Sequence, residues 1–378
     1  MQERDFSART SFPGSTGNPF DRALHRALVL QQIPAVPFAL LLFLIAFLVF
    51  QTRWLWTAGL FAFFCLDWIL IATLPKAGKS FGPSHPTVLA LAVMRALVAL
   101  LPAAIAIPLQ IVGILLVVYG FWIEPHTLRV TRQALVSSQV PPGQSFTLLH
   151  LGDLHLERIT RREKQLNRLI QELKPDLILF SGDFINLSYL KDPQAWASVR
   201  SLLQEWSAPY GVYAVTGSPA VDLEEIVPIL LDGMPIHHLS ANVATVDVHG
   251  IPVNLVGLDC SHRPFVDGPR LRALTAHLPG HLTILLYHSP DLAPVAATCG
   301  IDLQLSGHTH GGQVRLPILG ALFTGSLYGR LFDAGRMAIG PMVLYISRGI
   351  GMEGAAAPRV RFLCPPEIIL WTVTGKES

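Results

Sequence analysis

The stretch from residue 33 to residue 123 is almost free of charge, and it constrains the fold more than any other feature. It holds four apolar runs: Ile33–Phe50, Trp54–Leu74, Thr87–Ile105 and Pro108–Trp122. Each is close to the roughly 20 residues that cross about 30 Å of hydrocarbon. The runs lack a polar face, which argues against a water-exposed bundle. We therefore expect an all-α transmembrane region of about four helices over residues 33–123, although "LLPAAIAIPLQ" could be a turn between two spans or a kink in one.

Positive residues predict the orientation of these spans. They flank the predicted cytoplasmic ends, whereas the opposite side carries only Arg53; the flanking residues are Arg4, Arg9, Arg22, Arg26, Lys76, Lys79, Arg129 and Arg132. The positive-inside rule then places the N-terminal segment 1–32 and the C-terminal part of the chain in the cytoplasm. With only three spans, the C-terminal part would lie outside.

Two charged residues fall inside the apolar runs. Asp67 and Arg95 lie at similar depths, about 10–13 Å from the loop over residues 75–86 at a rise of about 1.5 Å per residue. Charged residues within a membrane usually face one another or a functional path. We predict an ion pair that holds the second and third runs together.

The remainder of the chain reads as a soluble α/β domain. Residues 124–145 are polar, end in Pro-Pro-Gly and predict a linker or an entry strand. From Phe146, apolar strand runs alternate with helical patterns, which predicts a largely parallel α/β core over residues 146–375. The late runs "MVLYISRG" and "EIILWTVT" are interpreted as edge or second-sheet strands. A net charge of +2 favours no nucleic-acid partner.

Acidic and imidazole side chains cluster where the predicted strands end, the edge at which open α/β sheets bind ligands. These residues are Asp153, His155, Asp183, His288, His308 and His310. Each alone could be a helix cap, a polar turn or a core histidine. Together they predict a metal site, and a mixed Asp/His set suits Mn, Fe or Zn better than Ca or Mg.

The order Asp-x-His, Gly-Asp, His, Gly-His-x-His resembles that of the calcineurin-like metallophosphoesterases. "GHTHGGQV", "YISRGIG" and "PPEIILWTV" resemble a membrane-associated bacterial branch that includes UDP-2,3-diacylglucosamine pyrophosphatases. The resemblance covers residues 146–375 and implies a two-sheet α/β sandwich in a bacterial inner membrane protein. It also implies two divalent metal ions: Asp153, His155 and His310 would hold one, His288 and His308 the other, and Asp183 would bridge them. A metal-bound hydroxide would then attack phosphorus in line.

One block departs from the family pattern. Where Gly-Asn-His is expected, "VTGSPAVD" keeps Gly217 but has Ser218 and Pro219. Losing the Asn ligand predicts a weakly bound second ion. Losing the His removes help for the leaving group, which typically costs about 10²–10⁴-fold. That loss matters least for a leaving group that is already a stable anion, as in a pyrophosphate.

No nearby residue is an evident substitute for the missing pair. His237 and His238 are interpreted as surface residues. Asp222, Glu224 and Glu225 are interpreted as the first turn of a helix, where acidic residues favour the dipole. Arg348 would either face the phosphate of the substrate or have a structural role.

Two main functions remain. The favoured one is a membrane-anchored metal-dependent phosphohydrolase that cleaves a pyrophosphate or activated phosphodiester bond in a lipid-linked or nucleotide substrate. The alternative is a catalytically impaired phosphoesterase-fold protein with a binding or regulatory role in the membrane. A transporter with a regulatory domain is the weakest interpretation, since the apolar region shows one candidate ion pair and no evident repeat.

Overall fold

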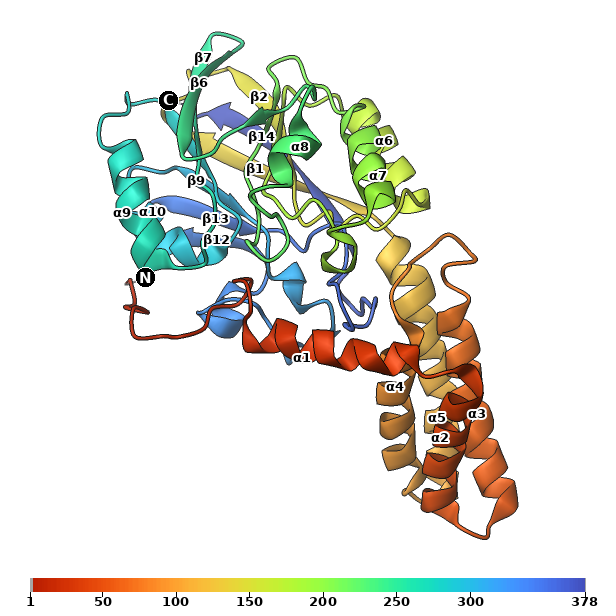
Figure 1. The fold of residues 1–378 in the computed structure, drawn as a ribbon. Coiled ribbons are helices and arrows are strands. Elements are labelled where there is room, and N and C mark those ends of the chain that lie inside the picture. The colour runs from red at the N-terminus through yellow and green to blue at the C-terminus, as the bar shows by residue number, and fades with distance from the viewer. Residues whose placement is uncertain (1–2, 378) are drawn as a thin grey trace.

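A bundle of four apolar helices projects from a larger α/β domain (Figure 1). The computed structural model describes residues 3–377. The bundle helices are α2 (Ala35–Phe50), α3 (Trp54–Ala72), α4 (Ser84–Ala99) and α5 (Ala103–Val117). Before them, helix α1 (Pro19–Ala27) and a 3₁₀ turn, η1 (Leu28–Gln32), run beneath the α/β domain and lead into the bundle.

The bundle has fewer full-length spans than the four expected. Within residues 3–377, two helices are long and apolar enough to cross a membrane: α3, and the continuous helix Ala103–His126 that extends α5 to 24 residues. The bent pair Pro19–Gln32 and Ala35–Phe50, which meets at 107°, would raise the number to three. Helix α4 is shorter, with 16 residues, or roughly 24 Å at about 1.5 Å per residue.

Of the two alternatives for "LLPAAIAIPLQ", the turn is the correct one, although it lies before Ile105, the predicted end of the third run. Chain reversal occurs at Leu100–Pro102, where Pro102 precedes the first residue of α5, whereas Pro108 lies inside that helix. The stretch "LLPAAIAIPLQ" is therefore a tight turn followed by a helix. The sequence alone did not distinguish the two prolines. A proline is tolerated at the start of a helix, as Pro102 is, and usually disrupts a helix interior, where Pro108 lies.

The predicted ion pair between Asp67 and Arg95 is present in the bundle. Arg95 donates from Nε to Asp67 Oδ2 at 2.5 Å and from Nη2 to Asp67 Oδ1 at 2.8 Å, and both side chains are buried. A third helix joins this pair, because Arg95 Nη1 also donates to Gln110 Oε1 at 3.0 Å. The contact therefore links α3, α4 and α5.

The α/β domain is a sandwich of two six-stranded sheets, as predicted. In spatial order the first sheet contains β1 (Arg129–Ser137), β14 (Glu367–Gly375), β2 (Ser145–Leu151), β3 (Leu177–Phe180), β4 (Val212–Ala214) and β5 (His237–His238). The second contains β12 (Gly335–Ile339), β13 (Met342–Ile346), β9 (Leu303–Ser306), β8 (Leu282–Leu286), β7 (Ile251–Gly257) and β6 (Asn242–Val248). A short hairpin, β10 (Arg315–Leu316) with β11 (Gly320–Ala321), lies apart from both.

Helices cover the outer face of each sheet, and a buried apolar layer separates the sheets. The covering helices are α6 (Arg161–Leu173), α7 (Pro193–Leu203) and α8 (Val227–Leu231) on the first sheet, and α9 (Pro264–Thr275) and α10 (Ala293–Ala296) on the second. Strand β2 shows the consequence: Leu148 packs between the sheets and Leu149 packs toward the helices. A strand buried on both faces reads as a continuous apolar run.

Two predictions around this sandwich need correction. Residues 124–145 are not a linker, because they include β1, which pairs in parallel with β14 along its length from Arg129↔Glu367 to Ser137↔Gly375. The entry-strand alternative is the correct one. The run "EIILWTVT" forms β14, which lies between β1 and β2 and is therefore not an edge strand.

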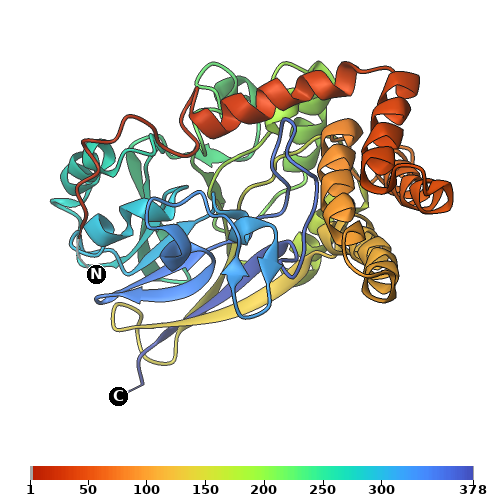
Figure 2. The ribbon, with the colours of Figure 1, turned by 90° about the horizontal axis from the view of Figure 1, so that it is seen from below.

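Hydrogen bonds fasten the bundle to the α/β domain. The backbone N–H of Cys364 donates to Glu124 Oε1 at 2.8 Å, and that of Arg361 donates to the Gly120 carbonyl at 2.9 Å. The loop between α3 and α4 also docks, since the Phe81 N–H donates to Glu157 Oε2 at 2.8 Å. Seen from below, the N-terminal segment and α1 run along one side of the α/β domain toward the bundle (Figure 2).

Candidate metal centre

All six predicted site residues lie together at the carboxyl ends of the strands. Asp153 and His155 follow β2, Asp183 follows β3, His288 follows β8, and His308 and His310 follow β9. Parallel strands direct their carboxyl ends to one edge, so loops distant in sequence meet there. Every one of these side chains is buried except His308, which is partly exposed.

Asp183 lies between two groups of imidazoles. Its Oδ2 is 3.1 Å from His155 Nε2 on one side and 3.2 Å from His288 Nε2 on the other. On the first side, His155 Nε2 and His310 Nε2 approach to 3.0 Å. Asp153, His155 and His310 each offer a ligand atom within 4.8 Å of the others, as do Asp153, Asp183 and His288.

The donor set fits divalent metal ions. Two ring nitrogens 3.0 Å apart, as in His155 and His310, converge as ligands of one ion do. Asp153 Oδ2 is buried and has no hydrogen-bond partner among the described residues. A buried carboxylate oxygen without a partner is costly, and a cation would compensate for it. Mixed carboxylate and imidazole donors suit Mn, Fe or Zn.

Burial and mutual charge set the protonation of these groups. Burial lowers the pKa of His308 to about 3 and that of His310 well below its usual range, so both rings are neutral and can donate a lone pair. Burial also opposes charge on His288, but the carboxylates of Asp183 and Asp153 outweigh it and raise its pKa to about 9. Despite its burial, Asp183 has a pKa well below the usual value because His288 and His155 face it.

The backbone at the site is held in an unusual conformation. The left-handed region is costly for residues other than glycine, yet it is occupied by Asp153 (φ 49°), His155 (39°), Asp183 (64°), His308 (72°) and His310 (51°). Such strain costs about 1–3 kcal/mol per residue and clusters at functional sites.

The segment "VTGSPAVD", residues 215–222, which differs from the family pattern, lies inside the site. The Ser218 N–H donates to Asp183 Oδ1 at 2.6 Å, and Ser218 Oγ is 3.2 Å from His288 Nε2 and 3.4 Å from His308 Nδ1. Gly217 permits this approach, since a Cβ there would lie 2.1 Å from Asp183 Oδ1. Ser218 thus occupies the expected position of the Asn, with a shorter side chain.

Two residues have roles at the site that the sequence did not predict. His262 follows β7 in "LDCSHRP", and its Nε2 is 3.1 Å from Ser218 Oγ. Its position shortly after a predicted strand was the available signal. Asp222 does not begin a helix, because α8 starts at Val227; instead its carboxylate accepts hydrogen bonds from the Asp183 and Gly217 N–H groups, each at 2.7 Å.

The other residues considered lie outside the metal cluster. His237 is exposed and stacks on Tyr213 with ring centroids 4.9 Å apart, and His238 lies 3.6 Å from Asp259. Arg348 has a structural partner, since its Nη2 is 2.5 Å from Glu367 Oε2 and its N–H donates to the same carboxylate.

Comparison with known proteins agrees with this geometry. The family described as calcineurin-like phosphoesterase matches residues 146–218. An uncharacterized metallophosphoesterase, YkuE of Bacillus subtilis, is 31% identical over 68% of this chain and 88% of its own length. The phosphodiesterase YaeI of Escherichia coli is 28% identical over 67% of this chain and 90% of its own. The UDP-2,3-diacylglucosamine pyrophosphatase LpxG of Chlamydia trachomatis is 25% identical over 67% of this chain and 91% of its own.

These relatives match over most of their own length. The chain therefore belongs to the calcineurin-like metallophosphoesterases, hydrolases of phosphoester or pyrophosphate bonds that use a dinuclear divalent metal centre.

Proposed function

We propose that this metallophosphoesterase is anchored in the membrane by its helical bundle and cleaves a pyrophosphate bond in a lipid-linked substrate. Asp153, His155 and His310 would hold one divalent ion, and His288 and His308 a second, with Asp183 between them. When bound, two such ions activate water and stabilise charge on the phosphoryl oxygens. The protein positions these ions, orients the substrate and limits access of bulk water.

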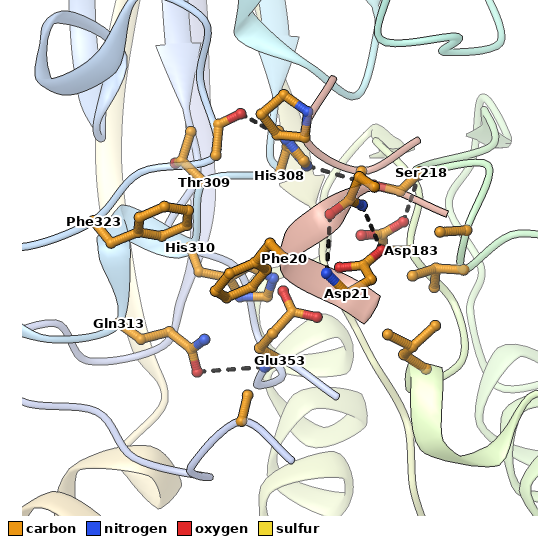
Figure 3. Close-up of a pocket in the computed structure, with 18 of the residues that line it drawn as sticks. Phe20, Asp21, Asp183, Ser218, His308, Thr309, His310, Gln313, Phe323 and Glu353 are labelled. Carbon is orange, nitrogen blue, oxygen red and sulfur yellow. Dashed lines mark hydrogen bonds between the residues drawn. The ribbon is translucent and has the colours of Figure 1, made fainter. Parts of the chain in front are cut away.

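A cavity that joins the metal site to the N-terminal segment carries this proposal. It has a volume of about 590 Å³, and His155 is among its lining residues. Asp183 and His308 of the metal site line it together with Phe20 and Asp21 of α1 (Figure 3). Phe20 stacks on Phe323, another wall residue, with ring centroids 5.1 Å apart. This size is in the range of small-molecule sites.

The cavity also lies close to the path of the chain into the bundle. Helix α1 forms part of its wall and continues through η1 into α2, the first bundle helix (Figure 1). A substrate whose lipid part stays in the bilayer would therefore present its phosphates beside α1. Arg9 lines the same cavity, and a guanidinium suits phosphate oxygens.

The outer surface of the bundle supports membrane anchoring. Its exposed side chains are predominantly large and apolar, including Leu40, Leu48, Ile69, Leu97 and Leu115. Contiguous exposed apolar surface of this kind marks contact with lipid or protein. The N-terminal segment and the α/β domain meet at the same end of the bundle. Together with the distribution of Lys and Arg, this supports the proposal that both lie in the cytoplasm of a bacterial cell.

The residue at position 219 favours a pyrophosphate substrate over a simple phosphoester. Pro219 stands where an imidazole would assist departure, and proline can neither donate a proton nor stabilise charge. An alkoxide needs that proton, whereas a phosphate or nucleotide leaves as a stable anion. General acid assistance is typically worth about 10²–10⁴-fold. The missing His thus disfavours alkyl phosphodiesters selectively.

The test compares two substrates on the purified full-length protein in detergent with Mn²⁺. We expect kcat/KM for a diacylated sugar-nucleotide pyrophosphate to exceed that for a dialkyl phosphodiester by about 10²-fold or more. Asp183→Ala, which removes the shared carboxylate, should abolish both activities and controls for contaminating enzymes. Equal rates on the two substrates would refute the assignment of the pyrophosphate.

The same assay examines the alternative of an impaired phosphoesterase. The observation that favours it is the exchange of Asn-His for Ser218-Pro219, which removes one expected ligand and one expected catalytic group. That alternative predicts binding of the nucleotide pyrophosphate without turnover, and no change in turnover on Asp183→Ala.

A further inference from the structure

We propose that His262 serves as a ligand of the second metal ion, in place of the amide side chain that Ser218 does not supply. The second ion would then be held by Asp183, His262, His288 and His308, four protein ligands with three imidazoles. This inference rests on the proposed function and assigns a residue outside the pattern that the family shares with this chain. A divalent transition ion such as Mn²⁺, Fe²⁺ or Zn²⁺ suits such a donor set.

Three imidazoles converge around one hydroxyl. Ser218 Oγ lies 3.1 Å from His262 Nε2, 3.2 Å from His288 Nε2 and 3.4 Å from His308 Nδ1. A hydroxyl has a single proton to donate, so Ser218 cannot satisfy three ring nitrogens as a donor. Each of the three histidines offers a ligand atom within 4.8 Å of the other two. Convergence of nitrogen donors on one point is what a shared cation requires.

His262 shares the features of the other candidate ligands. It follows the carboxyl end of β7, as they follow theirs, and only 2% of its surface is exposed. Its backbone is left-handed, with φ 58°, like that of Asp153, Asp183 and His308. Its ring lies 4.3 Å from that of His308 between centroids. A histidine that merely fills a core has no reason to adopt a strained backbone facing this cluster.

The N-terminal segment packs against the tip of the His262 ring, close to the Nε2 atom that also faces Ser218. A Cβ at Gly14 would lie 2.3 Å from His262 Nε2, so only glycine fits there, and its φ of 74° also favours glycine. The Ala220 N–H donates to the Gly14 carbonyl at 3.3 Å, which ties this segment to the loop carrying Ser218 and Pro219. His262, Gly14 and the loop that carries Ser218 and Pro219 are therefore all in contact with one another.

The test counts metal ions rather than turnover. Full-length protein in detergent is titrated with Mn²⁺ by calorimetry, and bound ions are counted by elemental analysis. We expect two ions in the wild type. His262→Ala should keep the first ion and weaken the second by more than the about 10–100-fold that loss of an outer partner costs. The exposed His277→Ala serves as the matched control and should behave as wild type.

A rescue variant separates ligation from packing. In the His262→Ala background, Ser218→Asn supplies an amide oxygen at the family position, and we expect it to restore part of the second affinity. If His262→Ala also loses the first ion, because the fold is damaged, His262→Gln keeps the volume with a weaker oxygen donor and should show an intermediate affinity.

The outcomes that overturn the inference are distinct from those that overturn the function. Two ions bound with wild-type affinity in both His262→Ala and His262→Gln would exclude His262 as a ligand and leave the proposed function standing. A wild-type protein that binds one ion or none would remove the second site, and with it both proposals.

Discussion

At the scale of single residues, Asp222 shows how the site loops are held together. Its carboxylate accepts hydrogen bonds from the N–H groups of Asp183 and Gly217, each at 2.7 Å, and of Phe184 at 2.9 Å. Burial, together with the nearby charge of Asp183, raises the pKa of Asp222 to about 7. Its partners are backbone groups from two loops, which leave no motif in the sequence. The nearby Glu224 and Glu225 instead predicted the first turn of a helix, where acidic residues are favourable.

Removing this carboxylate should loosen both loops. At a pH above the Asp222 pKa of about 7, where the carboxylate is charged, we expect Asp222→Ala to destabilise the α/β domain by about 3 kcal/mol or more. Hydrogen bonds to a charged group contribute about 1.5–3 kcal/mol each, and buried N–H groups would lose their acceptor. Thermal unfolding followed by circular dichroism measures this. The exposed Asp232→Ala is the control, and equal melting temperatures for the two variants would contradict the role assigned to Asp222.

The same scale shows what the sequence could and could not predict about the site. The six candidate ligands were predictable because each follows a strand that is recognisable from its apolar run. His262 obeys the same rule, but it falls five residues after the strand and outside any family block. Its relevance depends on the contact with Ser218, which brings together residues 44 positions apart.

At the scale of elements, the bundle is held by a polar contact within its apolar interior. Arg95 on α4 bonds to Asp67 on α3 with both of its adjacent nitrogens and to Gln110 on α5. Gln110 Nε2 returns a hydrogen bond to the Arg95 carbonyl at 2.8 Å. Depth along the predicted helices was enough to pair Asp67 with Arg95. Gln110 also lies in a predicted run, Pro108–Trp122, but an uncharged side chain gave no reason to pair it with Arg95.

A double-mutant cycle tests this contact. Asp67→Asn and Arg95→Gln should each lower the stability of the bundle, with Arg95→Gln the more severe because it also loses Gln110. Their effects should couple by about 0.5–3 kcal/mol, the range for residues in direct contact. Unfolding of the full-length protein in mixed micelles supplies the four free energies. Additive effects would show that the pair does not stabilise the bundle.

At the scale of the whole molecule, the N-terminal segment and the α/β domain together line the site, and the bundle is hydrogen-bonded to the α/β domain. The two-sheet fold followed from the alternation of strands and helices. The junction between bundle and domain did not follow from the sequence. It depends on hydrogen bonds of Gly120 and Glu124 to Arg361 and Cys364, and residues 124–145 alone are polar, as a linker would be. The course of residues 3–18 over the cavity was equally hidden, because the segment has no periodicity and is placed by contacts such as that of Gly14 with Ala220.

The central claim is that a dinuclear metal centre survives in this chain although Ser218 and Pro219 replace two expected residues. Mn²⁺ titration calorimetry of the full-length protein, wild type against Asp183→Ala, tests it most directly. We expect two ions per chain in the wild type, one tight and one weaker, and loss of both in the variant, because Asp183 lies between the two groups of histidines. A folded wild type that binds fewer than two Mn²⁺ ions, or an Asp183→Ala variant that binds two ions unchanged, would contradict it.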